Sequence, residues 1–139
     1  MVNFEVNIEP MGAVRMTGRG KFVKEAAQRY LSYKGLIGNV ASLKIKEPIE
    51  GPIKVIINFF YPIPKRFTKA QKLLAVKRMI VPTVKPDIDN CIKGVFDALN
   101  KIAWNDDNQV ARVISSKWYS DNPRIEITID HLTFEEVTA

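Results

Sequence analysis

The sequence of 139 residues contains one cysteine, Cys91, and one histidine, His131. A single cysteine cannot form an internal disulfide, and it cannot build a zinc site from thiolates. Cys91 lies in an apolar helical pattern, which favours a buried thiol. A single histidine excludes nuclease chemistry that depends on paired histidines, and it leaves serine or cysteine nucleophiles without a suitable partner.

Long apolar runs are also absent. No stretch approaches the roughly 18 uninterrupted apolar residues of a membrane span, and the N-terminal MVNFEVNIEP lacks a basic region followed by an apolar run. We therefore expect a cytoplasmic protein without a membrane partner. The glycine-rich stretch around Gly18 and Gly20 does not match GxxxxGK[ST], which argues against a nucleoside triphosphatase and a nucleotide cofactor.

The composition is that of an ordinary globular chain with an excess of positive charge. Apolar residues make up 46% and charged residues 26%, so we expect one domain over residues 1–139. Lys and Arg number 21 against 15 Asp and Glu, which gives a formal charge of +6. A basic protein attracts polyanions, but charge alone leaves nucleic-acid binding an even choice.

Hydrophobic periodicity predicts strands at both ends of the chain and helices between them. The predicted strands cover residues 2–8, 53–61, 109–120 and 124–132, and the second is expected to be central. The predicted helices cover residues 22–36, 68–80 and the segment that follows Pro86. This order predicts an α+β domain with a mixed or antiparallel sheet packed with helices.

The helical segment around residues 64–83 looks like an excursion from the core. Thr68 is suited to cap its helix, and Pro82 follows the helix's end. A lid, a DNA clamp and a dimer contact all fit this segment, so its role stays open.

Two aspartates, Asp87 and Asp89, stand where the chain enters the helix after Pro86. Mg²⁺ prefers carboxylate oxygen, so a rigid pair of this kind suits a magnesium site. Asp at a helix start also caps free amides, and for an isolated pair that interpretation is the stronger. The turn WNDDNQ adds Asp106 and Asp107 before a strand that is expected to bring one of them near the pair. Considered by itself, this sequence is more typical of a solvent-exposed turn than of a metal site.

Several cations accompany these carboxylates. Lys93 follows Asp89 by one helical turn, so it can pair with that residue or face a scissile phosphate. Asp97 lies one turn further along. Candidate DNA contacts are Arg15, Arg19, Lys21 and Lys85. Each of these four is by itself better explained as a solubility charge, but as a set they favour phosphate binding.

The segment KPDIDNCIKGVFDALNKIAWNDDNQV resembles the RusA family of Holliday junction resolvases. It shares an Asp-X-Asp-Asn at a helix start, a lysine four residues later, a Phe-Asp-Ala-Leu run and an Asp-Asp-X-Gln-Val turn. The resemblance implies that the metal ligands are Asp87, Asp89 and Asp107, that Lys93 is required for catalysis and that Asp106 is a possible helper. It also implies Mg²⁺ as the cofactor, with Mn²⁺ as the alternative.

The same resemblance implies a RusA-like fold and a homodimer that resolves four-way DNA junctions by paired symmetric nicks in recombination and repair. A two-fold dimer offers two identical sites to the two equivalent strands of a junction. The segment from Pro64 to Thr83 departs from the compact family pattern. Two alternatives remain: a nuclease of the same fold for other branched or single-stranded DNA, and a non-catalytic junction-binding protein.

Overall fold

The computed structural model describes residues 1–15, 24–133 and 135. Its elements are β1 (Val2–Val6), α2 (Glu25–Lys44), β2 (Ile53–Pro62), α3 (Lys69–Val76), α4 (Ile88–Leu99), the 3-10 turn η1 (Asp107–Gln109), β3 (Val110–Ser120) and β4 (Arg124–His131). This arrangement confirms the predicted α+β class. None of the helices in the described ranges combines the length and apolar character that crossing a bilayer requires.

The four strands form one mixed sheet in the order β1-β4-β2-β3. β4 is antiparallel to both of its neighbours, whereas β3 runs parallel to β2. The predicted central position of β2 is therefore confirmed. Ile53 at the start of β2 pairs with Val110, and Tyr61 near its end pairs with Tyr119. β3 thus begins at the same end of the sheet as β2.

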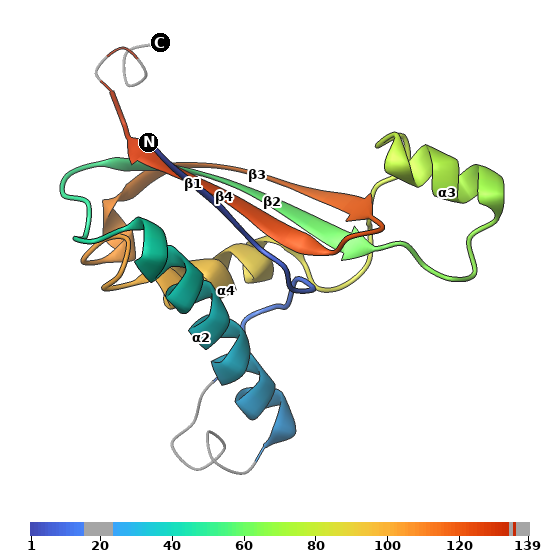
Figure 1. Cartoon of the computed structure of the whole chain (residues 1–139), viewed down its shortest axis with the longest axis horizontal. Helices are drawn as coiled ribbons and strands as arrows, with labels where there is room; N and C mark the ends of the chain where they lie inside the picture. The colour runs from blue at the N-terminus through green and yellow to red at the C-terminus, as the bar shows by residue number, and fades with distance from the viewer. Residues whose placement is uncertain (16–23, 134, 136–139) are drawn as a thin grey trace.

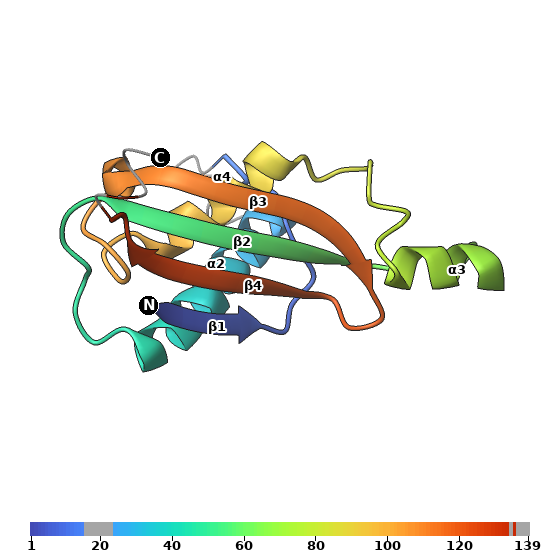
Figure 2. The same ribbon diagram turned by 90° about the horizontal axis from the view of Figure 1, so that it is seen from above.

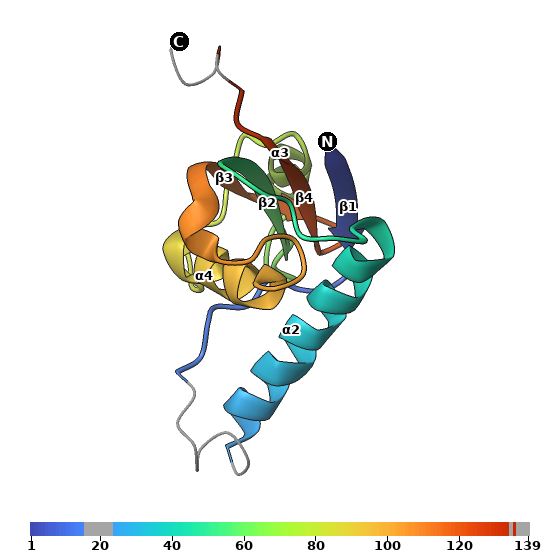
Figure 3. The same cartoon turned by 90° about the vertical axis from the view of Figure 1, so that its left-hand side faces the viewer.

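One face of the sheet carries two helices, α2 and α4, and the main core lies between the helices and the sheet (Figures 1 and 3). Alternate residues of β2 point into this core, because side chains along a strand alternate between faces. Ile53, Val55, Ile57 and Phe59 are all fully buried. β4 contributes Ile125, Ile127 and Ile129 in the same way.

The predicted helix over residues 22–36 is wrong at its C-terminal end, since α2 continues to Lys44. Glycine disfavours a helix by about 1 kcal/mol relative to alanine, so local propensity does not favour continuation through Gly38. The structure gives Gly38 a packing role: a Cβ there would lie 3.0 Å from Cδ1 of Ile102. Burial of Ile37 and Ala41 extends the helix beyond this close contact.

The predicted excursion is present as residues 63–86, which we call the arm, between β2 and α4. Figures 1 and 2 show its helix, α3, projecting beyond the end of the sheet. As expected, Thr68 caps α3: its hydroxyl accepts from the Gln71 amide at 3.1 Å, and the Gln71 side chain accepts from the Thr68 amide at 2.8 Å. The helix ends at Val76, before the predicted residue 80, because Arg78 adopts a φ of +64°.

Candidate metal and nucleic-acid site

The first turn of α4 presents two carboxylates to solvent. Asp87 is the N-cap residue, but its side chain makes no capping hydrogen bond, and only its backbone carbonyl accepts from the Cys91 amide, at 3.0 Å. Asp89 lies in the first turn, and both aspartates are exposed. Neither carboxylate has a hydrogen bond or ion pair with another residue of the described ranges. The interpretation of Asp87 as a capping side chain is therefore not supported.

The chain that leads into this pair is held from two sides. The hydroxyl of Tyr61 donates to the carbonyl of Pro86, and Nζ of Lys117 donates to the carbonyl of Val84 at 2.7 Å. Tyr61 and Lys117 come from β2 and β3, so the sheet fixes the segment just before Asp87. Lys117 was not anticipated from the sequence, because its proximity depends on β3 lying beside β2.

The N-terminal segment closes a cleft beside Asp87. The amide of Ala13 donates to the carbonyl of Asn90 at 3.2 Å, and Nδ2 of Asn90 donates to the carbonyl of Ala13 at 3.3 Å. A Cβ at Gly12 would overlap Nδ2 of Asn90, so glycine permits this approach. The result is a cavity of about 440 Å³ lined by Pro10, Met11, Gly12, Lys85, Pro86, Asp87 and Asn90.

Burial keeps two side chains behind this site protonated. Cys91 is fully buried, as expected, and its burial raises the pKa of the thiol. Burial also raises the pKa of the Tyr61 hydroxyl, with further contributions from Cys91, Tyr33 and Asp87. Both groups stay neutral at ordinary pH, so they leave the charge of the site to the exposed aspartates.

Lys93 lies on the same helix, and its ion pair is with Asp97, at 3.6 Å, rather than with Asp89. The other oxygen of Asp97 accepts a hydrogen bond of 2.9 Å from the Tyr30 hydroxyl of α2. The Lys93 side chain remains 68% exposed, so its ammonium is open to an anion. Asp97 therefore anchors Lys93, and its carboxylate is already engaged by two neighbours.

The turn before β3 assigns different tasks to its two aspartates. The Asp106 side chain caps η1 by accepting from the Asn108 amide at 3.1 Å. Gln109 completes this capping box and also donates from Nε2 to the carbonyl of Ile49 at 2.9 Å. Asp107 is partly exposed, and its carboxylate makes no hydrogen bond within the described ranges. Of the two, Asp107 is the one left available for a metal.

The expected approach of Asp107 to Asp87 and Asp89 does not occur within one chain. Asp107 precedes Val110, which pairs with Ile53, whereas Asp87 follows Pro86 beside Tyr61. Ile53 and Tyr61 are about 26 Å apart at a strand's rise of about 3.3 Å per residue. Accordingly, no group of three His, Cys, Asp or Glu residues in the described ranges is arranged to hold a metal. The cause is the parallel pairing of β3 with β2. β3 begins beside the start of β2, at the end of the sheet that lies opposite to Tyr61 and Asp87.

The predicted DNA contacts are only partly described. Arg15 and Lys85 are exposed, and Lys85 lines the cleft beside Asp87. Arg19 and Lys21 lie outside the described residues. Sequence reasoning did not single out the arm's other exposed cations: Lys65, Arg66, Lys69, Lys72, Lys77 and Arg78. The sequence does show this feature, because the segment is rich in Lys and Arg and contains no Asp or Glu.

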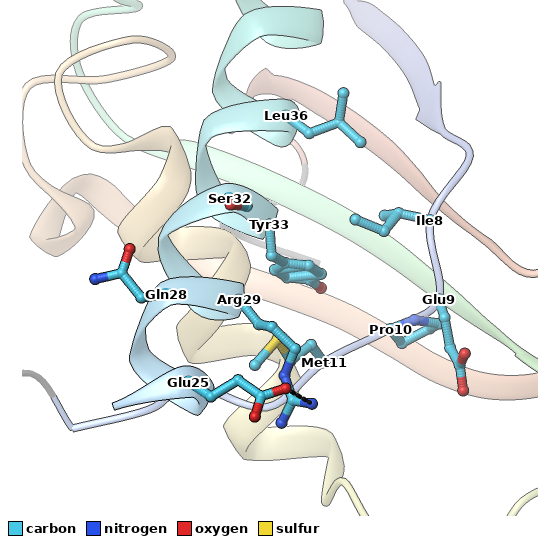
Figure 4. A pocket seen from close by; sticks show the side chains of 10 residues that line it. All are labelled: Ile8, Glu9, Pro10, Met11, Glu25, Gln28, Arg29, Ser32, Tyr33 and Leu36. Atoms are coloured by element: carbon cyan, nitrogen blue, oxygen red, sulfur yellow. Dashed lines mark ion pairs between the residues drawn. The ribbon is translucent and has the colours of Figure 1, made fainter. Parts of the chain in front are cut away.

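A larger cavity lies between the N-terminal segment and α2, with a volume of about 660 Å³. Figure 4 shows the Glu25–Arg29 ion pair at its edge, where the two side chains lie 3.7 Å apart. Its wall includes Ile8, Met11, Tyr33 and Leu36. Its charged lining residues are Glu9, Glu25 and Arg29, and the one cation among them is paired with Glu25. The carboxylate pair of α4 therefore remains the better candidate for phosphodiester chemistry.

Comparison with known proteins agrees with this choice. The family model described as "Endodeoxyribonuclease RusA" matches residues 7–130. The chain belongs to the RusA family. A relative from Bacillus subtilis (strain 168), YqaN, is 38% identical over 123 residues, covering 86% of this chain and 84% of its own, and is described as uncharacterized. RusA membership implies an endodeoxyribonuclease that resolves Holliday junctions, and it implies recognition of branched DNA.

Proposed function

We propose that this RusA protein is a Mg²⁺-dependent endonuclease that resolves four-way junctions in the cytoplasm by paired symmetric nicks, with Mn²⁺ as an alternative ion. The observation that carries the proposal is the pair Asp87 and Asp89, whose carboxylates are exposed beside a cleft and have no partner among the residues that the structure describes. Free carboxylates at a helix start carry no structural benefit through capping. Their repulsion of DNA phosphates is relieved only when a cation lies between them.

The donor set fits a hard divalent ion, because carboxylate oxygens are the ligands that Mg²⁺ prefers. We assign Asp87, Asp89 and Asp107 as the residues that hold it. A bound ion would activate a water molecule and offset negative charge on the phosphate. Lys93, restrained by Asp97 and otherwise exposed, is placed to hold a phosphate oxygen and to offset charge during attack.

We infer that Asp107 reaches the pair from a second copy of the chain. The three residues cannot meet within one chain, since β3 begins at the far end of the sheet from Asp87. A two-fold dimer solves this geometrically: each copy donates its Asp107 to the other's Asp87 and Asp89, and two identical sites result. In this arrangement an isolated subunit lacks a complete site.

A nuclease for other branched or single-stranded DNA shares every residue of this proposal, so only the substrate separates the two. A non-catalytic junction-binding protein would use the aspartates as caps. That alternative is disfavoured because the Asp87 side chain makes no capping bond, whereas Asp106 does.

The proposal is tested by incubating the purified protein with a labelled synthetic four-way junction, a linear duplex or a single strand, in Mg²⁺, Mn²⁺ or EDTA. We expect paired, symmetric nicks in two strands of like polarity with either metal and none in EDTA. Binding of the junction without nicking in either metal would support the non-catalytic alternative. Equal cutting of single-stranded DNA would support the broader nuclease.

A further inference from the structure

The arm, residues 63–86, concentrates the positive charge of the molecule. It holds seven Lys and Arg and no Asp or Glu: Lys65, Arg66, Lys69, Lys72, Lys77, Arg78 and Lys85. The rest of the chain holds the other 14 Lys and Arg against all 15 Asp and Glu, a formal charge of −1. The attraction to polyanions that the whole sequence indicates therefore comes from this one segment.

These cations are available for a ligand. All seven are exposed, and in the described ranges none lies within ion-pair distance of a carboxylate. Surface cations held apart from acids keep their full field, which a neighbouring carboxylate would otherwise cancel.

Aromatic and cation–π contacts anchor the base of the arm to the sheet, and they set the direction in which the arm projects. The ring of Phe67 packs edge-on against Tyr119, with 5.5 Å between centroids. The Arg78 guanidinium lies 4.6 Å from the Trp118 ring centroid and 5.7 Å from that of Phe60. Stacking of this kind is stabilising, and it opposes the cost of the left-handed backbone of Arg78.

The arm also ends at the carboxylate pair. Its last residue, Pro86, accepts the Tyr61 hydrogen bond and is followed directly by Asp87. Lys117 holds Val84 of the arm against the sheet through a bond of 2.7 Å. A ligand bound at the C-terminal end of the arm, at Lys85, therefore lies beside Asp87, and one that follows the arm outward extends from there to α3.

We propose that the arm binds the phosphate backbone of a DNA branch and thereby directs the junction to Asp87 and Asp89 of the same chain. The inference rests on the proposed function, because it takes the substrate to be branched DNA. On α3, Lys69 and Lys72 lie one turn apart on a face shared with Leu73 and Val76, which are 55% and 52% exposed. The lysines contact phosphates, while the apolar side chains lie against the sugars.

A second copy of the chain is the competing occupant, since exposed apolar side chains also suit a protein interface. Charge decides against it. Two arms brought together would place 14 like charges in one interface without acids on either, which is strongly unfavourable once solvent is excluded. DNA, in contrast, binds the same cations favourably, because its condensed counterions are released on binding.

The test compares two triple variants that carry the same net charge. In the arm variant, Lys65, Lys69 and Lys72 are each changed to Gln; in the control, Lys44, Lys46 and Lys101, which are exposed and lie outside the arm, are changed to Gln. Affinity for a labelled four-way junction and for an equally long duplex is measured in EDTA at several salt concentrations. Each lost phosphate contact reduces the slope of log K against log[salt] by about 0.9, so we expect a reduction of about 2.7 in the arm variant.

The control variant should keep the wild-type slope, and an arm variant with Lys changed to Arg at the same three positions should keep it as well. Equal loss in both Gln variants would reduce the effect to net charge and overturn the inference, as would an unchanged slope in the arm variant. A shift in oligomeric state by light scattering, with unaltered DNA binding, would assign the arm to a second copy instead. Should the arm variant unfold, Lys69→Gln alone, compared with Lys44→Gln, gives the same comparison with a slope change of about 0.9.

Nicking in Mg²⁺ is recorded for every variant, which separates the two proposals. Wild type that nicks the junction while the arm variant binds it normally refutes only the arm inference. Wild type that binds through the arm but never nicks refutes only the proposed catalysis.

Discussion

The hydroxyl of Tyr30 on α2 lies 2.9 Å from Oδ2 of Asp97 on α4 and donates a hydrogen bond to it. Through this contact α2 restrains a carboxylate whose other oxygen lies 3.6 Å from Nζ of Lys93. The contact therefore links helix packing to the position of the proposed phosphate-binding lysine.

This contact predicts that substitutions at Tyr30 and Lys93 lower the nicking rate to different degrees. Tyr30→Phe keeps the ring but removes the donor, so we expect the free energy of unfolding to fall by about 1 kcal/mol. Lys93→Met should lower the single-turnover nicking rate by at least tenfold, and Tyr30→Phe should lower it by a smaller factor. Urea unfolding and single-turnover assays on a four-way junction measure the two effects. A Lys93→Met protein that nicks at the wild-type rate would remove Lys93 from the site.

The aspartates of α4 and of the turn before β3 should respond oppositely to substitution. Asp87→Asn should abolish nicking without loss of stability, because the Asp87 side chain makes no capping hydrogen bond. Asp106→Ala should destabilise the fold by about 1 kcal/mol through loss of the η1 cap, while some nicking is retained. Thermal unfolding and the nicking assay check both. Destabilisation by Asp87→Asn instead would favour a structural role for that residue.

A metal site that combines residues of two subunits can be tested by mixing two inactive variants. Asp87→Asn and Asp107→Asn proteins should each be inactive alone. If Asp107 acts from the second copy, a mixed dimer retains one site with all three aspartates, so co-refolding the two variants should restore nicking of a single strand. The products are resolved on denaturing gels. Inactive mixtures, shown by light scattering and differential tags to contain mixed dimers, would place all three residues in one subunit.

Alkaline pH should destabilise the fold. Burial raises the pKa of Tyr30, Tyr33 and Tyr61 above their ordinary value. In the unfolded chain these hydroxyls ionise near pH 10, whereas in the folded protein they resist ionisation. The unfolded state then binds fewer protons, so stability is present below about pH 10 and is lost as pH rises further.

Tyr33→Phe isolates one of these groups. Its hydroxyl is buried, with no hydrogen-bond partner of acceptable geometry in the described ranges. Removal of an unsatisfied buried hydroxyl should therefore raise the free energy of unfolding by about 1 kcal/mol and weaken its decline above pH 10. Denaturant titrations between pH 7 and 11 measure both effects, and a loss of stability in Tyr33→Phe at pH 7 would contradict the prediction.

The sequence predicted helices and strands well where the hydrophobic periodicity and the flanking Pro or Gly residues indicate the same segment. The apolar stripe that begins at Ile88 predicted α4, and the apolar run from Ile53 predicted a central β2. It failed where tertiary packing outweighs propensity. α2 passes through Gly38 because Ile37 and Ala41 are buried, and a Cβ at Gly38 would lie 3.0 Å from Cδ1 of Ile102. No feature of the sequence near Gly38 indicates that contact.

The sequence by itself determined the family, the α+β class and the identity of the chemical groups, because those depend on residue types and short spacings. Only the tertiary structure decided their use. The Asp106 side chain caps η1, whereas the side chains of Asp87 and Asp107 make no hydrogen bond to any residue that the structure describes, since such bonds depend on backbone geometry. Parallel pairing of β3 with β2 carries Asp107 away from Asp87, and strand direction is set by contacts across the sheet. A linear sequence does not encode that direction locally.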